Sequence, residues 1–184
     1  MDTLEGIKRT HHCGELRKDH VDTEVVLCGW VSRRRDHGGL IFVDLRDRSG
    51  LVQVVIDEAA IGEDAFHKAE TIRNEFVLAI RGKVGARDAE TINPHMATGE
   101  IEIAVEDLRI ISESETPPFY IEDENTANES LRLKYRYLDL RRPVMQNNMI
   151  LRHKIAKSAR DYFDEQGFLE IETPMLVPST LCIL

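Results

Sequence analysis

The stretch from Val31 to Gln53 contains side chains whose types and spacing suit the binding of a nucleobase. Arg33 and Arg35 precede Phe42, and Gln53 follows it. An unstacked base is held when an aromatic ring stacks on it, a guanidinium binds phosphate or a base edge, and an amide pairs with the Watson–Crick edge. The alternative is that Phe42 belongs to a hydrophobic core and the arginines form a solvated strand edge, because aromatic residues favour strands for packing reasons alone. This stretch leaves both interpretations open.

Three β-strands and two turns must position these side chains. The turns are His37-Gly38-Gly39 and Arg48-Ser49-Gly50, where glycine tolerates the positive φ of tight turns. Because side chains alternate along a strand, LIFVDLR places Phe42 and Asp44 on the face opposite the core. The predicted core side chains of this strand are Ile41, Val43 and Leu45. We therefore expect arginine, phenylalanine and glutamine to gather on the outer face of one antiparallel sheet.

The neighbouring segments predict a small closed barrel. A first strand spans Glu24 to Arg35, and Gly29 within it suggests a bulge or bend. A helix is predicted from Glu63 to Arg73, a fourth strand from Glu75 to Arg87, and a fifth from about Glu100 to Ile111. In the fifth strand, the inward residues are Ile101, Ile103 and Val105 and the outward ones are Glu102, Ala104 and Glu106. Five strands with a helix between the third and fourth is the order of the OB-fold, whose sheet face often binds oligonucleotides, although fold alone does not fix function.

A linker separates this barrel from a second region. Residues 112–128 are rich in acids, contain Pro117-Pro118 and show no periodicity, which is typical of a connection between domains. We expect one domain at 1–112, a linker or hinge at 113–140, and the start of a second domain at 141–184.

The second region begins with a long predicted helix. Pro143 suits an early helical position, the helix runs to about Gln166, and Gly167 is a suitable C-terminal cap. A strand from Phe168 to Ile171 follows and ends at Thr173-Pro174. Apolar residues recur along the helix at helical spacing: Leu151, Ile155, Ala159, Tyr162 and Phe163. This stripe must pack against another surface.

The net charge of −9 over 184 residues argues against a general polyanion binder, so RNA binding needs a local patch. Between positions 33 and 48, five arginines outnumber three acids, a surplus of two. They are Arg33, Arg34, Arg35, Arg46 and Arg48 against Asp36, Asp44 and Asp47. Neither a signal peptide nor an apolar run of about 18 residues is visible, so neither secretion nor membrane spanning is expected.

The cysteines indicate a reducing compartment. Cys13, Cys28 and Cys182 are an odd set without a C-x-x-C pair, so neither a disulfide framework nor a zinc ribbon is predicted, and a cytoplasmic location fits. The adjacent His11-His12-Cys13 could be read as metal ligands, but adjacent side chains rarely converge on one ion. We expect no metal site.

The run RRRDHGGLIFVDLRDRSGLVQVV resembles the anticodon-binding domain of bacterial-type aspartyl-tRNA synthetases. The resemblance continues through RNEFVLAIRGKVGAR, MATGEIEI, LRLKYRYLDLRRP and GFLEIETPML, and it covers about Cys13 to Thr180. It implies a mainly β fold class, an OB-fold barrel with a helix between strands three and four, followed by the start of a class II synthetase α/β catalytic domain.

The resemblance also implies roles for individual residues. Arg35, Phe42, Gln53 and Glu102 match positions that contact the anticodon, with Phe42 stacking on the central uridine and the other three reading its neighbours. His37 matches a turn position where family members that also charge tRNA for asparagine have histidine; the alternative is an ordinary polar turn residue.

The resemblance bears on four further residues. Gly167, Phe168 and Pro174 match the first class II signature motif, which builds the homodimer interface. Thr91 stands where many relatives have asparagine, so anticodon contacts from its loop are not carried over.

The implied function is an aspartate–tRNA ligase, with possible use of both tRNA-Asp and tRNA-Asn, that couples aspartate to tRNA through an aspartyl-adenylate. The full enzyme would need ATP and Mg²⁺, act as a homodimer, and bind the anticodon arm of tRNA, with no DNA or membrane partner. Relatives continue after Thr180 with Pro-Glu-Gly-Ala-Arg, whereas this sequence ends at Leu184, so we expect a truncated chain without catalytic residues, bound cofactor or activity of its own. The alternatives are a stand-alone OB-fold RNA-binding module and a class II synthetase for lysine or asparagine.

Overall fold

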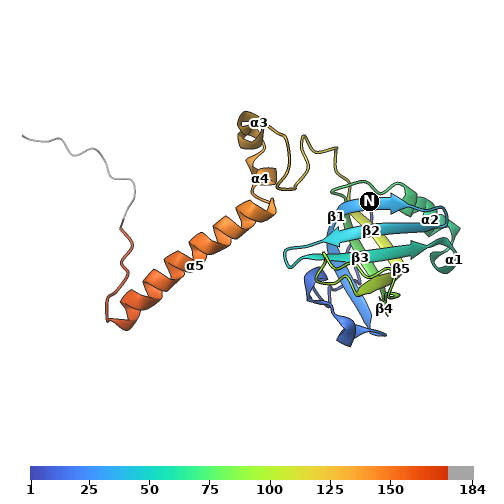
Figure 1. Ribbon diagram of the computed structural model, residues 1–184, viewed down its shortest axis with the longest axis horizontal. Helices are drawn as coiled ribbons and strands as arrows, with labels where there is room; N and C mark the ends of the chain where they lie inside the picture. Colours follow the sequence, from blue (N-terminus) through green and yellow to red (C-terminus); the bar gives the residue numbers. More distant parts are fainter. Residues whose placement is uncertain (174–184) are drawn as a thin grey trace, which may run out of the picture. The chain divides into compact units, whose positions relative to one another are not determined.

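The computed structural model describes residues 1–173 and divides the chain into two compact units between Pro117 and Pro118. In the first unit, five strands form a closed barrel in the order β1-β2-β3-β5-β4 (Figure 1). The strands are β1 Glu24–Asp36, β2 Leu40–Arg46, β3 Leu51–Asp57, β4 Val77–Ala86 and β5 Ile101–Ser112. All neighbouring pairs are antiparallel except β3 and β5, whose short parallel pairing closes the barrel. The predicted OB-fold is confirmed.

The alternation of side chains in β2 and β3 separates a core face from an outer face. Ile41, Val43 and Leu45 are fully buried, as are the matching β3 residues Val52 and Ile56. Phe42 lies between them in sequence and is only half-buried, on the face away from this core. The prediction of an outward Phe42 is therefore confirmed, and the interpretation of its ring as part of the barrel core is wrong.

Strand β1 pairs with two different strands along its length. It pairs with β4 from Glu24 to Trp30 and with β2 from Trp30 to Asp36. Gly29 lies at this changeover, where a Cβ would come within 2.6 Å of the Arg46 carbonyl oxygen, so glycine permits a close backbone approach. The irregularity in register falls after it, between Val31 and Arg33.

This register slip positions the arginines of β1. Beyond it, Arg33 lies opposite Asp44, and Arg35 lies opposite Phe42. Directly opposed residues share one face of an antiparallel pair. Arg33 and Arg35 are therefore on the outer face with Phe42, as predicted.

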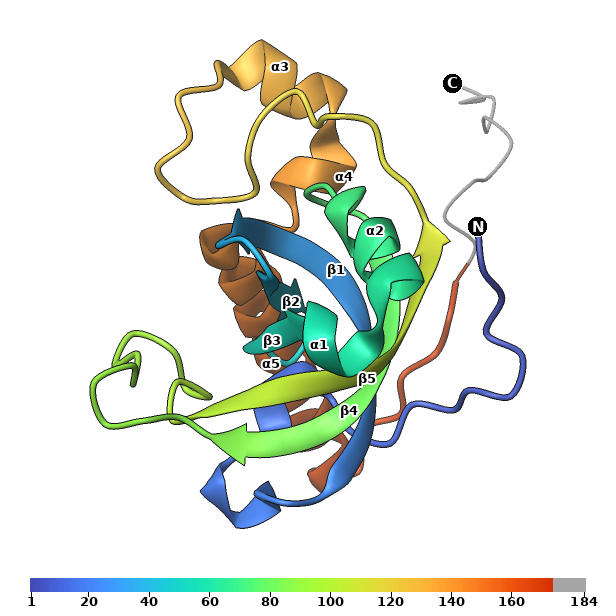
Figure 2. The same ribbon diagram turned by 90° about the vertical axis from the view of Figure 1, so that its right-hand side faces the viewer.

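The region between β3 and β4 differs from prediction in its details. Two helices are present, α1 Glu58–Ile61 and α2 Glu63–Glu70, separated by Gly62 at φ +87°. The Asp57 carboxylate caps α1 by accepting the N–H of Ala59 at 3.0 Å. Helix α2 ends three residues before the predicted Arg73, because the Thr71 hydroxyl and the Arg73 guanidinium bond to carbonyls of the last turn. Figure 2 shows both helices beside the barrel, with β4 and β5 side by side.

The second unit contains α3 Glu129–Lys134, α4 Arg136–Asp139 and α5 Pro143–Glu165. Helices α3 and α4 fall within the range predicted to be linker. Helix α5 begins at Pro143 as predicted, and Gly167, at φ +82°, donates its N–H to the Asp164 carbonyl. The Phe168 N–H bonds to the Phe163 carbonyl, and their rings pack 5.7 Å apart, so the helix ends in a Schellman motif.

The predicted strand from Phe168 to Ile171 is wrong, because the structure assigns it no strand. The described part of the second unit offers no other strand with which it could form a ladder. The apolar stripe of α5 is exposed: Leu151, Ile155 and Tyr162 are each more than half accessible. Pro174 and the residues after it lie outside the described part of the chain.

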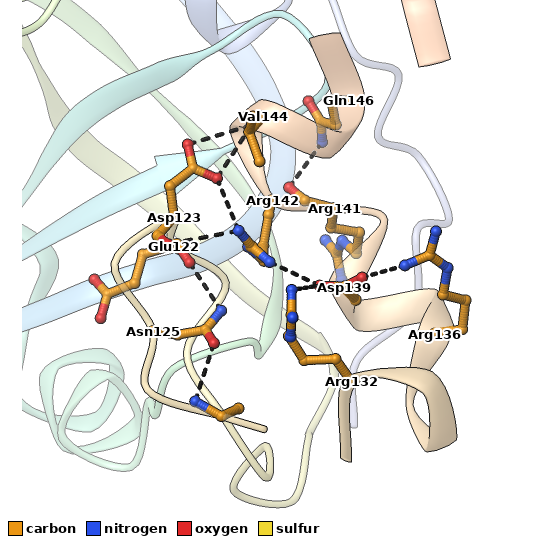
Figure 3. Close-up of polar contacts among 11 residues, drawn as sticks. Glu122, Asp123, Asn125, Arg132, Arg136, Asp139, Arg141, Arg142, Val144 and Gln146 are labelled. Atoms are coloured by element: carbon orange, nitrogen blue, oxygen red, sulfur yellow. Dashed lines mark hydrogen bonds and ion pairs between the residues drawn. The ribbon is translucent and has the colours of Figure 1, made fainter. Parts of the chain in front are cut away.

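An ion-pair cluster organises the start of the second unit (Figure 3). Asp139 is buried and accepts a hydrogen bond from Arg142 Nη1 at 2.9 Å. Arg136 also bonds to its carboxylate, and Arg132 lies 3.8 Å away. The Asp123 carboxylate, from the loop before α3, accepts the N–H of Val144 in the first turn of α5. These contacts join the loop to α4 and to the N-terminus of α5.

Candidate nucleic-acid interface

Five polar side chains form a row across the outer face of the barrel. We call Asp44, Arg35, Gln53, Glu102 and Arg87 the polar row. The strand register brings them together, since Asp44 lies opposite Gln53. The parallel pairing of β3 with β5 then places Gln53 beside Glu102. The row therefore crosses four strands of one sheet surface.

Arg35 and Gln53 form the centre of this row. Arg35 Nη2 donates to Asp44 Oδ1 at 2.6 Å and approaches Gln53 Oε1 at 3.3 Å. Gln53 Nε2 in turn donates to Glu102 Oε2 at 3.2 Å. The amide oxygen of Gln53 therefore points toward the guanidinium and its nitrogen toward the carboxylate. A base edge would meet groups whose orientation is set before binding.

Arg87 lies next to Glu102 and forms an ion pair with it. Its side chain is 4% exposed, and its Nε lies 3.4 Å from Glu102 Oε2. Its Nη1 donates to the carbonyls of Thr91 and Gly99 at 3.2 and 3.3 Å, which ties it to the loop between β4 and β5. Sequence analysis did not identify this residue as part of the site. No sequence pattern near Arg87 points to the site, because only the pairing of β4 with β5 brings Arg87 to Glu102.

Phe42 is positioned by the hairpin that precedes it. The His37 N–H donates to the Leu40 carbonyl at 2.9 Å, and Gly38 adopts φ +78° in the turn. The rings of His37 and Phe42 meet edge to face, with centroids 5.4 Å apart and planes at 86°. Phe42 stays partly exposed beside this contact, and it lies opposite Arg35 in the β1–β2 ladder.

The structure brings all the predicted anticodon residues onto this one face. Arg35, Phe42, Gln53 and Glu102 come from β1, β2, β3 and β5. His37 adds an exposed ring at the hairpin end. Aromatic and guanidinium groups in reach of one another can stack on a base and bind its edge or phosphate.

The residues considered as metal ligands have a structural role. The Asp47 carboxylate accepts the N–H of Cys13 at 2.8 Å and lies 3.2 Å from His12 Nδ1. Burial alone would raise the pKa of Asp47, but hydrogen bonds from Ser49, Cys13 and His12 outweigh it and lower that pKa. Burial strongly raises the pKa of the Cys13 thiol, so this group is unreactive. Across residues 1–173, no three His, Cys, Asp or Glu side chains are grouped to hold a metal ion.

Comparisons with known proteins match both units. Residues 25–111 match the family of OB-fold nucleic acid binding domains, and residues 128–181 match class II tRNA synthetases (D, K and N). An aspartate–tRNA(Asp/Asn) ligase of Symbiobacterium thermophilum is 60% identical over 95% of this chain and 29% of its own length. A second such ligase, from Thermoanaerobacter sp., is 57% identical over 97% of this chain and 30% of its own.

Solved structures agree with these relatives. The asparaginyl-tRNA synthetase of Pyrococcus horikoshii complexed with asparaginyl-adenylate superposes with a TM-score of 0.79 at 28% identity, over 93% of this chain and 37% of that one. The chain spans about 30% of the length of the curated relatives it matches. Along nearly its whole length, the chain is therefore similar to the N-terminal portion of aspartate–tRNA(Asp/Asn) ligases, and its two units match an OB-fold nucleic acid binding domain and class II tRNA synthetases.

Proposed function

We propose that the outer face of this barrel binds the anticodon arm of a tRNA, as part of an aspartate–tRNA ligase. The observation that carries the proposal is the polar row beside Phe42: Arg35 bonds to Gln53 and Gln53 bonds to Glu102, next to a partly exposed ring. If these side chains served only to pack the barrel core, they would be buried. If they formed only a solvated strand edge, they would not be hydrogen-bonded to one another. Anticodon bases are single-stranded, so their faces and edges are available to such a surface.

Each side chain supplies a different part of recognition. Phe42 stacks on the central base of the anticodon, a contact that every base can make through its π-face. Arg35 and Gln53 contact the edges of neighbouring bases as donor and as mixed donor and acceptor. Glu102 accepts from a base amino group. Arg87, which is nearly buried, holds the Glu102 carboxylate in place.

The proposed activity of the whole protein is the attachment of aspartate to tRNA through an aspartyl-adenylate, in the cytoplasm. ATP and Mg²⁺ would supply activation of the amino-acid carboxylate. None of the helices within residues 1–173 has the length and apolar character needed to cross a membrane.

Dimer formation through the first class II motif is part of the same proposal. The support is the exposed apolar side of α5, where Leu151 and Ile155 are 57% and 63% accessible. Gly167 and Phe168 end this helix, and the Phe168 ring packs against Phe163. An exposed stripe of this kind needs a partner surface.

We also propose that His37 relaxes discrimination between tRNA-Asp and tRNA-Asn. Its ring packs edge-on against Phe42, so it stands beside the base that Phe42 would stack. The test is aminoacylation of both tRNAs by a full-length family enzyme that carries this N-terminal region, with and without His37→Leu. A strong preference for tRNA-Asp that His37→Leu leaves unchanged would remove the proposal.

A stand-alone RNA-binding module is the second candidate, because the first unit holds both the closed barrel and the complete polar row. Binding of a fluorescent anticodon stem-loop to the 184-residue chain tests what the two candidates share. We expect saturable binding that weakens when the three anticodon bases are replaced. Equal affinity for both stem-loops would contradict anticodon recognition. The stand-alone role would be favoured over the ligase only if the full-length form failed to charge tRNA.

A further inference from the structure

Asp44 is an acidic residue on the face that we propose meets RNA. It lies in β2, opposite Gln53 on one side and Arg33 on the other. Its side chain is 16% exposed, so its charge is near the surface. A carboxylate on a face that binds a polyanion lowers affinity by repulsion. Its place in the polar row therefore needs a reason other than RNA affinity.

The contact with Arg35 provides that reason. Asp44 Oδ1 accepts from Arg35 Nη2 at 2.6 Å, a short contact between opposite charges, and such charge-assisted bonds are stronger than neutral ones. The Arg35 side chain is 36% exposed and has many rotamers available to it in water. Pairing with Asp44 fixes the guanidinium in the free protein. The conformational entropy of the Arg35 side chain is therefore already lost before RNA binds, so binding does not have to order it.

The effect of Asp44 extends to Gln53. The same Arg35 Nη2 atom lies 3.3 Å from Gln53 Oε1, while Gln53 Nε2 donates to Glu102. An amide can rotate by half a turn and exchange its donor and acceptor. The guanidinium on one side and the carboxylate on the other favour a single orientation of this amide.

We propose that Asp44 is a positioning residue, which orients Arg35 and, through it, the Gln53 amide, and which increases base discrimination at the expense of RNA affinity. This inference rests on the proposed function. Without Asp44, the Arg35 charge is free to follow RNA phosphates, which carry no sequence information. Binding then becomes less selective rather than uniformly weaker.

The test uses Asp44→Asn, which keeps the shape of the side chain and removes its charge. Asp107→Asn is the matched control, because Asp107 also pairs with arginines on the outer surface, Arg81 at 3.4 Å and Arg109 at 3.6 Å. Affinities of the 184-residue chain are measured for the anticodon stem-loop and for versions with one anticodon base replaced. We expect Asp44→Asn to lower the ratio of cognate to replaced affinity by about five- to 150-fold, the range that one oriented base contact supplies.

Several outcomes separate this role from a purely structural one. We expect affinity for the replaced stem-loops to stay the same or rise, Asp107→Asn to leave the ratio unchanged, and Asp44→Asn to have no further effect on it in an Arg35→Ala background. Equal weakening toward all stem-loops would overturn the positioning role. So would the same drop in ratio without Arg35.

A measurement without RNA keeps the inference distinct from the proposed function. The side-chain amide signals of Gln53 in the ¹⁵N spectrum of the free chain should shift in Asp44→Asn and not in Asp107→Asn. Unmoved signals would overturn the positioning role even if the wild-type chain reads the anticodon. Shifted signals in a chain with no preference among stem-loops would instead contradict the proposed function, and Asp44 would then have no bases for its partners to read.

Discussion

Replacing Phe42 with alanine separates RNA binding from packing in one variant. If the ring stacks on a base, its loss should weaken binding of the anticodon stem-loop by about 1–3 kcal/mol, or about five- to 150-fold in Kd. The ring is only half-buried, so the loss of unfolding free energy should be about 1 kcal/mol, mainly from its contact with His37. A fully buried phenylalanine would cost about 3–5 kcal/mol instead.

Both quantities are needed for the Phe42→Ala test, with fluorescence anisotropy for Kd and urea unfolding for stability. Leu40→Ala is the control, since Leu40 is on the same face of β2 and is 37% exposed, but is not among the residues predicted to contact the anticodon. It should change stability slightly and leave Kd nearly unaltered. A loss of several kcal/mol in stability with unchanged affinity per folded Phe42→Ala molecule would refute the reasoning.

Three further predictions concern the framework around this face. Residues 1–117 should fold alone and give a dispersed amide NMR spectrum, since all five strands lie within them; collapsed signals would show that the barrel needs the second unit. Asp139→Ala should destabilise the second unit by about 1–3 kcal/mol, because the Arg142 guanidinium then loses its buried carboxylate partner. Hydrogen exchange at the start of α5 should also accelerate. Asp161→Ala, which removes an exposed pair with Lys157, is its control and should cost a few tenths at most; equal effects would contradict the argument. The lowered pKa of Asp47 means that its contribution to stability is present above its unfolded pKa of about 4 and is lost as pH falls through the folded value. Urea midpoints of wild type and Asp47→Asn should therefore differ most above about pH 5 and converge in acid, and a constant difference would argue against this origin.

Local patterns were enough to predict the barrel and to place Phe42 on its outer face. The alternation in LIFVDLR is strict, and a one-residue shift would have placed Ile41, Val43 and Leu45 in water. Helix α5 was equally predictable, since Pro143 and Gly167 mark its ends. The local sequence of these elements is sufficient to specify them, without contacts from distant parts of the chain.

The missed features depend on contacts that a sequence does not display. The slip between Val31 and Arg33 is a property of the β1–β2 register, not of Gly29. Arg87 joins the site only because β4 pairs with β5. The segment after Gly167 has a strand-like composition, yet a strand exists only where another strand pairs with it.

Mapping of RNA contacts by NMR tests the central claim most directly. The ¹⁵N-labelled chain is titrated with an anticodon stem-loop, and shifts are followed at backbone and side-chain nitrogens. The largest shifts should fall on Phe42, on the Gln53 amide, on Arg35 Nε and on the Glu102 backbone. Saturable binding whose shifts instead cluster around Arg81 and Asp107, or on α5, would contradict recognition of the anticodon by this face of the barrel.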